Sequence, residues 1–232
     1  MAFFYHATIR VDGILWYHTS ARPESMGYIH LMLPVFHNYG FVLALAGYVA
    51  DPDVGYSSIG GKTLYKQPLD LFHRFGIYSY PLYTVKAVQQ TIFLSAKGEG
   101  FVEAKGKGRF AYPDIARNTV LLPGSILETL IISEYKLPSR LITRIGSKRA
   151  GTLHIRLYPV TPKVAENSRV THYYNLGDVV ETSGGIVIIN HPAGDIAFLG
   201  TASKAYIYSI NQGTTRRKTI TLPALKSERS LS

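Results

Sequence analysis

The sequence predicts an α+β fold, in which an antiparallel sheet is covered by helix on one face. Three observations lead to this expectation. Apolar residues make up 46% of the 232-residue chain, which is enough for a packed core. Several short runs alternate between apolar and polar residues, as half-buried strands do. Residues 35–50 repeat their apolar side chains at helical spacing instead.

The alternating pattern and the helical spacing predict the elements of the N-terminal half. Residues 2–11 alternate and are rich in aromatic and β-branched types, so we expect a strand there, ending at an Asp12-Gly13 turn. The helix over 35–50 should stop at Asp51-Pro52, because the residue before a proline avoids helical geometry. Two further elements are expected: a short helix near 67–75 and a strand over 84–96.

The sequence pattern of the C-terminal half predicts mainly strands. Residues 119–135 contain two extended segments around a Pro-Gly turn, and residues 151–158 (GTLHIRLY) alternate strictly. From Gln212 the chain becomes polar and basic, and the last residues are expected to form a flexible tail. The other expectations are a short element within 138–150, short strands within 173–210, and a tail over 226–232.

No internal repeat or linker divides the chain, so residues 1–232 are expected to form a single domain with an insertion over 51–115. Strands that bracket a helix favour a sheet with helix on one face. A ferredoxin-like core, of the kind that RNA-recognition motifs use, is one architecture of this type.

Composition and motifs exclude several kinds of site. The chain has no cysteine, which excludes disulfides, thiolate metal sites and a cysteine nucleophile. Its eight histidines are scattered, and none has the spacing of a metal or catalytic motif. We therefore expect no metal and no cofactor. No apolar run of about 18 residues could span a membrane, and the start lacks a secretion signal, so we expect a cytoplasmic protein without a membrane partner.

Positive charge is concentrated in one part of the sequence. Through Glu134 there are 11 Lys/Arg residues against 10 Asp/Glu, whereas from Tyr135 onward there are 14 against 5. A one-sided positive field attracts polyanions, and nucleic acid is the leading candidate.

The strongest candidate for a binding motif lies between Ser139 and Gly151. This stretch contains basic residues and no acidic one, and its glycine-bracketed turn could offer backbone amides, a hydroxyl and cations to phosphates. A solvated basic turn between two strands is the alternative interpretation. The candidate phosphate-binding residues are Arg140, Arg144, Ser147, Lys148 and Arg149.

Two further groups are candidates for RNA contact. The glycine-rich segment 97–110 carries Lys105, Lys107 and Arg109, although its two glutamates partly cancel this charge and favour a mobile surface hairpin instead. His37, Asn38 and Tyr39 stand together at the start of the expected helix and could contribute hydrogen bonds or stacking. Most of the other aromatic residues are expected to fill the core.

Four segments, in order, resemble a known family. They are FFYHATIRV in the opening strand, HNYGFVLALAG at 37–47, LLPGSILETLII at 121–132 and PSRLITRIGSKRAG at 138–151. This ordered set resembles the subtype I-D (Csc-one) branch of the Cas-five family of CRISPR-associated proteins. The likeness spans roughly residues 2–158. It departs from the usual I-R-L-G-K-like run at Thr143 and at Ile145, where leucine is more usual.

The resemblance implies a ferredoxin-like core with a thumb-like hairpin inserted over 51–115. It implies a non-catalytic subunit of the Cascade effector complex that holds the 5′ handle of the CRISPR RNA in the cytoplasm of a prokaryote, with an archaeon as one option. The implied neighbours are the backbone (Cas-seven-type) subunit and the large (Cas-ten-type) subunit. Target double-stranded DNA near its protospacer-adjacent motif would lie close by.

Two alternatives stay open at this stage. A metal-independent endoribonuclease needs only a histidine, tyrosine or lysine as a general base near a phosphate, and sequence spacing does not exclude it. A structural protein could also use its basic charge merely to dock on nucleic acid. The first alternative predicts RNA cleavage in EDTA, and the second predicts weak binding without preference for sequence or end.

Overall fold

A computed structural model describes residues 2–16, 20–24, 27–31, 35–49, 68–95, 115–145, 151–190, 194–212 and 216–226. These residues are mostly strand, and they hold two helices, α1 (Asn38–Val49) and α2 (Pro68–Phe75). Apart from the parallel pair β3 (Gly27–Leu31) and β8 (Ile115–Leu121), their strands pair antiparallel. No helix in this part of the chain is long and apolar enough to cross a membrane.

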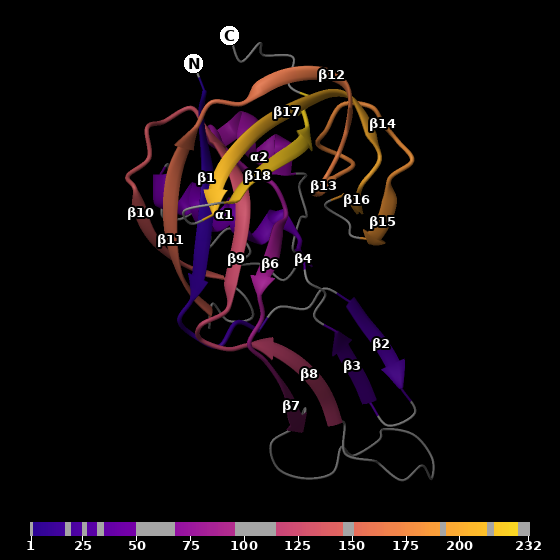
Figure 1. The fold of residues 1–232 in the computed structure, drawn as a ribbon. Helices are drawn as coiled ribbons and strands as arrows, with labels where there is room; N and C mark the ends of the chain where they lie inside the picture. The colour runs from indigo at the N-terminus through magenta and orange to yellow at the C-terminus, as the bar shows by residue number, and fades with distance from the viewer. Residues whose placement is uncertain are drawn as a thin grey trace.

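The main sheet has seven strands and is strongly twisted (Figure 1). Its order is β10-β11-β1-β9-β6-β4, and β5 also pairs with β9. β1 is the centre of this sheet, because its residues pair with β11 on one side and with β9 on the other. The strands are β1 (Phe3–Val11), β4 (Val35–Phe36), β5 (Ile77–Ser79), β6 (Leu82–Lys86), β9 (Ile126–Ser133), β10 (Arg140–Ile145) and β11 (Gly151–Val160).

The helices cover one face of the main sheet. Successive strand residues point to opposite faces, so the odd-numbered residues of β1 from Tyr5 to Val11 point toward α1. They pack there against Phe41, Val42 and Leu45, which are buried on α1. We call this cluster the helix-side core. It also contains Leu71 and Phe75 of α2.

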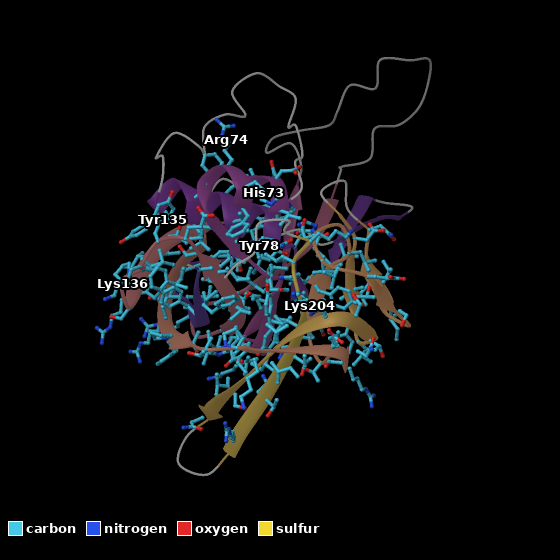
Figure 2. The ribbon with its side chains drawn as sticks, turned by 90° about the horizontal axis from the view of Figure 1, so that it is seen from above. His73, Arg74, Tyr78, Tyr135, Lys136 and Lys204 are labelled. Atoms are coloured by element: carbon cyan, nitrogen blue, oxygen red, sulfur yellow. The ribbon has the colours of Figure 1, made fainter. Side chains whose placement is uncertain are left out.

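A second sheet covers part of the other face, and Leu69 and Phe72 of α2 join the core that it forms. The sheet contains β12 (Lys163–Arg169), β14 (Thr182–Ser183), β17 (Thr201–Gln212) and β18 (Arg216–Pro223), with β17 in its centre. The ring of Phe4 on β1 meets Tyr206 on β17 edge to face, with the centroids 5.3 Å apart. Leu130 and Leu222 are buried in the same cluster, which we call the hairpin-side core. Figure 2 shows the β17–β18 hairpin and the helices on opposite sides of the body.

Two smaller sheets complete the described residues. β13 (Tyr173–Asn175), β16 (Ile196–Phe198) and β15 (Ile186–Ile189) form a three-stranded sheet beside the body. β2 (Ser20–Glu24), β3, β8 and β7 (Gln89–Ser95) form an arm that extends away from the body (Figure 1). The expected insertion over 51–115 is therefore divided. Residues 68–86 join the main body and β7 enters the arm, whereas 51–67 and 96–114 lie outside the described residues.

The predicted ferredoxin-like α+β fold is wrong. Such a core alternates strands and helices in the order β-α-β-β-α-β, whereas the described residues are mostly strand, hold only two helices and form four sheets. The error arose in the last third of the chain, where a strand can form with little apolar pattern. β12 (KVAENSR) has mostly exposed, polar side chains, and it is a strand because it pairs with β17.

Most expected elements are confirmed, with shifted ends. The strand over 2–11 is β1, the strict alternation of 151–158 is β11, and the stretch near 67–75 is α2. The helix over 35–50 begins only at Asn38, because Val35 and Phe36 pair with β6 as β4. The expected strand over 84–96 is interrupted and divides between β6 and β7. Residues 227–232 of the expected tail lie outside the described residues, and Lys226 donates hydrogen bonds to Leu176 and Gly177.

Candidate nucleic-acid interface

Part of the main sheet's second face is left open. The β17–β18 hairpin lies over Phe4 and His6 of β1, and outward side chains further along β1 and on β10 and β11 remain exposed or half-exposed. We call this surface the open face. Its residues are Thr8, Arg10, Arg140, Ile142, Arg144, His154, Arg156 and Tyr158.

Local alternation builds this face. In β10 (RLITRI) the buried residues are Leu141 and Ile145, so the two arginines and Ile142 point outward. In β11 (GTLHIRLYPV) Leu153, Ile155 and Leu157 enter the helix-side core, so the residues between them point to the open face. The same pattern that secures the core therefore places basic and aromatic side chains side by side.

Gly151 lets β11 start close to its neighbours. A Cβ atom at this position would lie 2.6 Å from Cδ1 of Leu15 and 3.0 Å from the carbonyl oxygen of Ile145. Ile145 is the cross-strand partner of Gly151, so a side chain there would push β10 and β11 apart.

The register aligns the open-face residues in rows across three strands. Arg140 lies opposite Arg156, which lies opposite Thr8. In the next row Ile142 lies opposite His154, which lies opposite Arg10. Directly opposed residues in antiparallel strands have their Cβ atoms roughly 5 Å apart, so each row is a contiguous strip of side chains.

The rows line a hollow with a volume of about 570 Å³. This volume lies within the range of about 300–1,000 Å³ that is usual for sites of small ligands. The lining combines guanidinium groups, hydroxyls, an imidazole and aliphatic carbon. The lining residues are Thr8, Arg10, Ile126, Arg140, Leu141, Ile142, His154, Ile155, Arg156 and Tyr158.

In the part of the chain that the structure describes, three arginines of the open face lack a counter-charge. Within the described part of the chain, no carboxylate lies within 4 Å of Arg140, Arg144 or Arg156. Arg140 and Arg156 are directly opposite each other, and like charges in such a pair repel. An anion placed between them would remove this repulsion, and a planar guanidinium binds phosphate through two parallel hydrogen bonds.

The fourth arginine, Arg10, is held by Asp12. Its Nε and one terminal nitrogen donate to the two carboxylate oxygens at 2.7 and 2.9 Å. Nε2 of His154 lies 3.0 Å from the same carboxylate. The hydrogen bonds from Arg10 lower the pKa of Asp12 and raise the pKa of Arg10, so the pair stays charged. This contact orients the guanidinium at the edge of the hollow.

A buried polar cluster lies next to the open face, beneath the hairpin. Tyr83 donates a hydrogen bond to Glu128, and Nζ of Lys218 lies 2.8 Å from the Tyr83 hydroxyl and 3.4 Å from the Glu128 carboxylate. Nε2 of His6 lies 3.8 Å from the other oxygen of Glu128. Burial raises the pKa of Glu128, but the nearby His6, the hydrogen bond from Tyr83 and the charge of Lys218 outweigh burial and lower this pKa to about 2.

The predicted phosphate-binding residues fall into two groups. Arg140 and Arg144 are exposed on β10, and Arg140 lines the hollow. Ser147, Lys148 and Arg149 follow directly in the connection from β10 to β11, and they lie outside the described residues. Lys105, Lys107 and Arg109 also lie outside the described residues.

His37 and Asn38 are buried and Tyr39 is half-buried, and none of them lies on the open face. The Asn38 amide is completely buried and donates to the Tyr78 hydroxyl and to the Ser79 carbonyl at 3.1 and 2.9 Å. Nε2 of His37 lies 2.8 Å from the carbonyl oxygen of Gly194. Tyr39 packs against the helix-side core. In this conformation these residues join the start of α1 to the rest of the body.

Sequence reasoning missed six residues of the open face as site residues. They are Thr8, Arg10, Ile142, His154, Arg156 and Tyr158. The signal for three of them was present, because the strict alternation of GTLHIRLY already separates a buried set from an outward set. Arg10 had no such signal, since only the pairing of β1 with β11 brings it opposite His154.

A sequence model of one protein family covers almost all of the chain. The family is described as type I-D CRISPR-associated protein Cas5/Csc1, and it matches residues 2–226. The chain belongs to this family. The match confirms the resemblance noted in four segments of the sequence and extends it through the C-terminal strands. No curated protein matches the chain.

Membership in the type I-D Cas5/Csc1 family is consistent with a role in a CRISPR interference complex. The open face offers what a nucleic-acid subunit needs: guanidinium groups for phosphates and exposed apolar and aromatic surface for bases. Among the described residues, no group of three or more His, Asp or Glu side chains is arranged to hold a metal ion.

Proposed function

We propose that this Cas5/Csc1 family member is a non-catalytic RNA-binding subunit of a type I-D Cascade complex. It binds the 5′ handle of the CRISPR RNA and caps the backbone filament in the cytoplasm. The observation that carries the proposal is the open face, where Arg140, Arg144 and Arg156 stand together without a carboxylate within 4 Å in the described part of the chain.

Electrostatics support RNA as the ligand of this face. Phosphates dominate the affinity of proteins for nucleic acid, and arginine is well suited to their geometry. The excess of 14 basic over 5 acidic residues from Tyr135 onward includes all three of these arginines. In this proposal Ser147, Lys148 and Arg149, which follow β10 directly in the sequence, also contact the RNA. Lys105, Lys107 and Arg109 form a further basic segment.

Family membership supports the proposed neighbours. In a complex of this kind the chain meets the Cas-seven-type backbone subunit and the Cas-ten-type large subunit, near the point where target double-stranded DNA enters beside its protospacer-adjacent motif. The guide sequence is read by base pairing, so the subunit needs to recognise only the handle and the RNA backbone.

The test is a salt titration of RNA binding in EDTA. The full chain is mixed with labelled CRISPR RNA, with and without the 5′ handle. The test variant replaces Arg140, Arg144 and Arg156 by Gln. The charge-matched control replaces three lysines by Gln instead. These are Lys136, Lys163 and Lys204, which are exposed and do not line the hollow.

We expect the wild-type chain to prefer RNA with the handle. In the arginine variant, binding should weaken and the slope of log K against log salt should decrease by roughly 0.7 for each lost phosphate contact. The lysine control should keep the wild-type slope and melting temperature. Equal slopes in the two triple variants would contradict RNA binding at the open face.

The same reactions test the two alternatives. Cleaved RNA with a 2′,3′-cyclic phosphate end would replace the non-catalytic proposal with an endoribonuclease. Weak binding that ignores the handle would leave only a structural protein that docks on nucleic acid. The sequence also predicts that Lys148 and Arg149 contact RNA phosphates. A variant with both residues replaced by Ala tests this prediction, and its readouts are the affinity for RNA and the slope of log K against log salt.

A further inference from the structure

Two large apolar side chains stand among the arginines of the open face. Ile142 is 58% exposed and Tyr158 is 48% exposed, and both line the hollow. Ile142 lies between Arg140 and Arg144 along β10, and Tyr158 follows two residues after Arg156 along β11. A surface that bound only phosphates would gain nothing from this apolar area, so the ligand should carry an apolar or aromatic part as well.

The arrangement matches the chemistry of an unstacked nucleotide. A nucleobase has an apolar face that stacks on aromatic side chains, and its edges carry hydrogen-bond acceptors. The hollow supplies the Tyr158 ring, the Ile142 side chain, and donors from Arg10 and Thr8. Arg140 and Arg156 form a cross-strand pair at the same site, so a phosphate can be held beside the base.

We propose that the hollow of about 570 Å³ between β1, β10 and β11 binds one unstacked RNA base against Tyr158 and Ile142, while Arg140 and Arg156 hold the adjoining phosphate. This inference rests on the proposed function and adds the form of the ligand. The ligand is single-stranded, because a base inside a duplex has both faces covered by its neighbours.

The experiment removes bases one at a time from the handle. A series of handle RNAs, each with one abasic nucleotide, is titrated with the full chain and with Tyr158→Ala and Ile142→Ser. Each variant has a control of equal exposure elsewhere on the body. Tyr135→Ala removes a ring that is 47% exposed, and Ile186→Ser changes an isoleucine that is 59% exposed. Figure 2 shows Tyr135 at the rim of the body, next to Lys136.

We expect one handle position at which loss of the base weakens wild-type binding by roughly 5- to 150-fold, the range of a lost base–aromatic stack. In Tyr158→Ala the same base removal should have little further effect, because the stacking partner is already missing. Tyr135→Ala should keep the full effect. A handle annealed to its complement should bind less tightly than the single strand.

The outcomes separate this inference from the proposed function. If the arginine variant loses handle binding but no abasic position changes the affinity, the base site is wrong and the RNA-binding proposal stands. The base site is also wrong if Tyr158→Ala and Ile142→Ser respond to base removal as strongly as their controls. If the wild-type chain shows no handle-dependent binding, both proposals fail.

Discussion

Two buried titratable residues, Asp178 and His172, carry pKa shifts in opposite directions. Burial raises the pKa of Asp178 to about 6, although Tyr78 and the Leu69 amide donate hydrogen bonds to its carboxylate at 3.0 and 3.2 Å. Burial and the charge of Lys218 lower the pKa of His172 to about 4. Each residue favours its neutral form in the folded chain, because a buried charge loses its hydration.

These shifts predict opposite effects of pH on stability. Between pH 4 and 6 the folded state holds more protons on Asp178 than the unfolded state, so this residue lowers stability as pH rises. Over pH 4 to 6.5 His172 holds fewer protons when folded, so it raises stability as pH rises. The free energy of unfolding of Asp178→Asn, minus that of the wild type, should therefore rise between pH 4 and 6. The same difference for His172→Gln should fall between pH 4 and 6.5. Each change should reach up to about 3 kcal/mol.

Urea denaturation at several pH values measures these slopes. The informative quantity is the free energy of unfolding of each variant minus that of the wild type, because the contributions of all other titrating groups cancel in this difference. Parallel stability curves for the wild type and both variants would contradict the two shifts.

At the scale of elements, the β17–β18 hairpin forms one boundary of the open face. Tyr206 and Tyr208 pack it against β1, with the Tyr208 hydroxyl 3.2 Å from Nδ1 of His6. Lys218 adds a polar anchor, because its ammonium group reaches Tyr83 and Glu128 on the main sheet. The next residue toward the tip, Arg217, is exposed. The hairpin thus has one side attached to the sheet and one side free.

Removal of this anchor should loosen the hairpin. Lys218→Met keeps the aliphatic stem but leaves the buried Glu128 with less compensation, so we expect a loss of about 1–3 kcal/mol. Hydrogen exchange of the β17 and β18 amides should accelerate, while the central strand β1 changes less. Arg217→Met is the matched control, and equal exchange in both variants would contradict the role of Lys218.

At the scale of the whole molecule, one sheet carries two cores. The helix-side core and the hairpin-side core contact opposite faces of β1 and β9, so neither core is complete without the main sheet. β18 contributes Ile220 and Leu222 to the second core although it lies near the end of the chain. The C-terminal strands are therefore part of the body and not an accessory.

This arrangement predicts one cooperative unfolding transition. Leu45→Ala in the helix-side core and Leu222→Ala in the hairpin-side core should each destabilise the chain by about 2–5 kcal/mol, because both side chains are buried. The two variants should keep a single transition with the wild-type m-value. Val164→Ala, at a position that is 55% exposed, should change stability by less than about 0.5 kcal/mol. Two separate transitions would show that the cores fold independently.

The sequence predicted the elements whose side chains alternate or repeat clearly. β11 has a clear period of two, β1 alternates over its second half, and the buried residues Phe41, Val42, Leu45 and Ala46 of α1 lie at helical spacing, so local pattern was sufficient. β12 and β18 were missed because polar and basic residues dominate them and their strand form depends on pairing with β17. The same reason explains the wrong fold class, since these strands build the second sheet.

By itself, the sequence determined the family, most of the regular elements and the concentration of basic residues after Tyr135. These properties are local or additive along the chain. Only the tertiary structure decided that Thr8, Arg140 and Arg156 share one row and that Asn38 is buried. Neighbours in a sheet are set by long-range register, and a shift of one residue would turn every side chain of a strand to the other face.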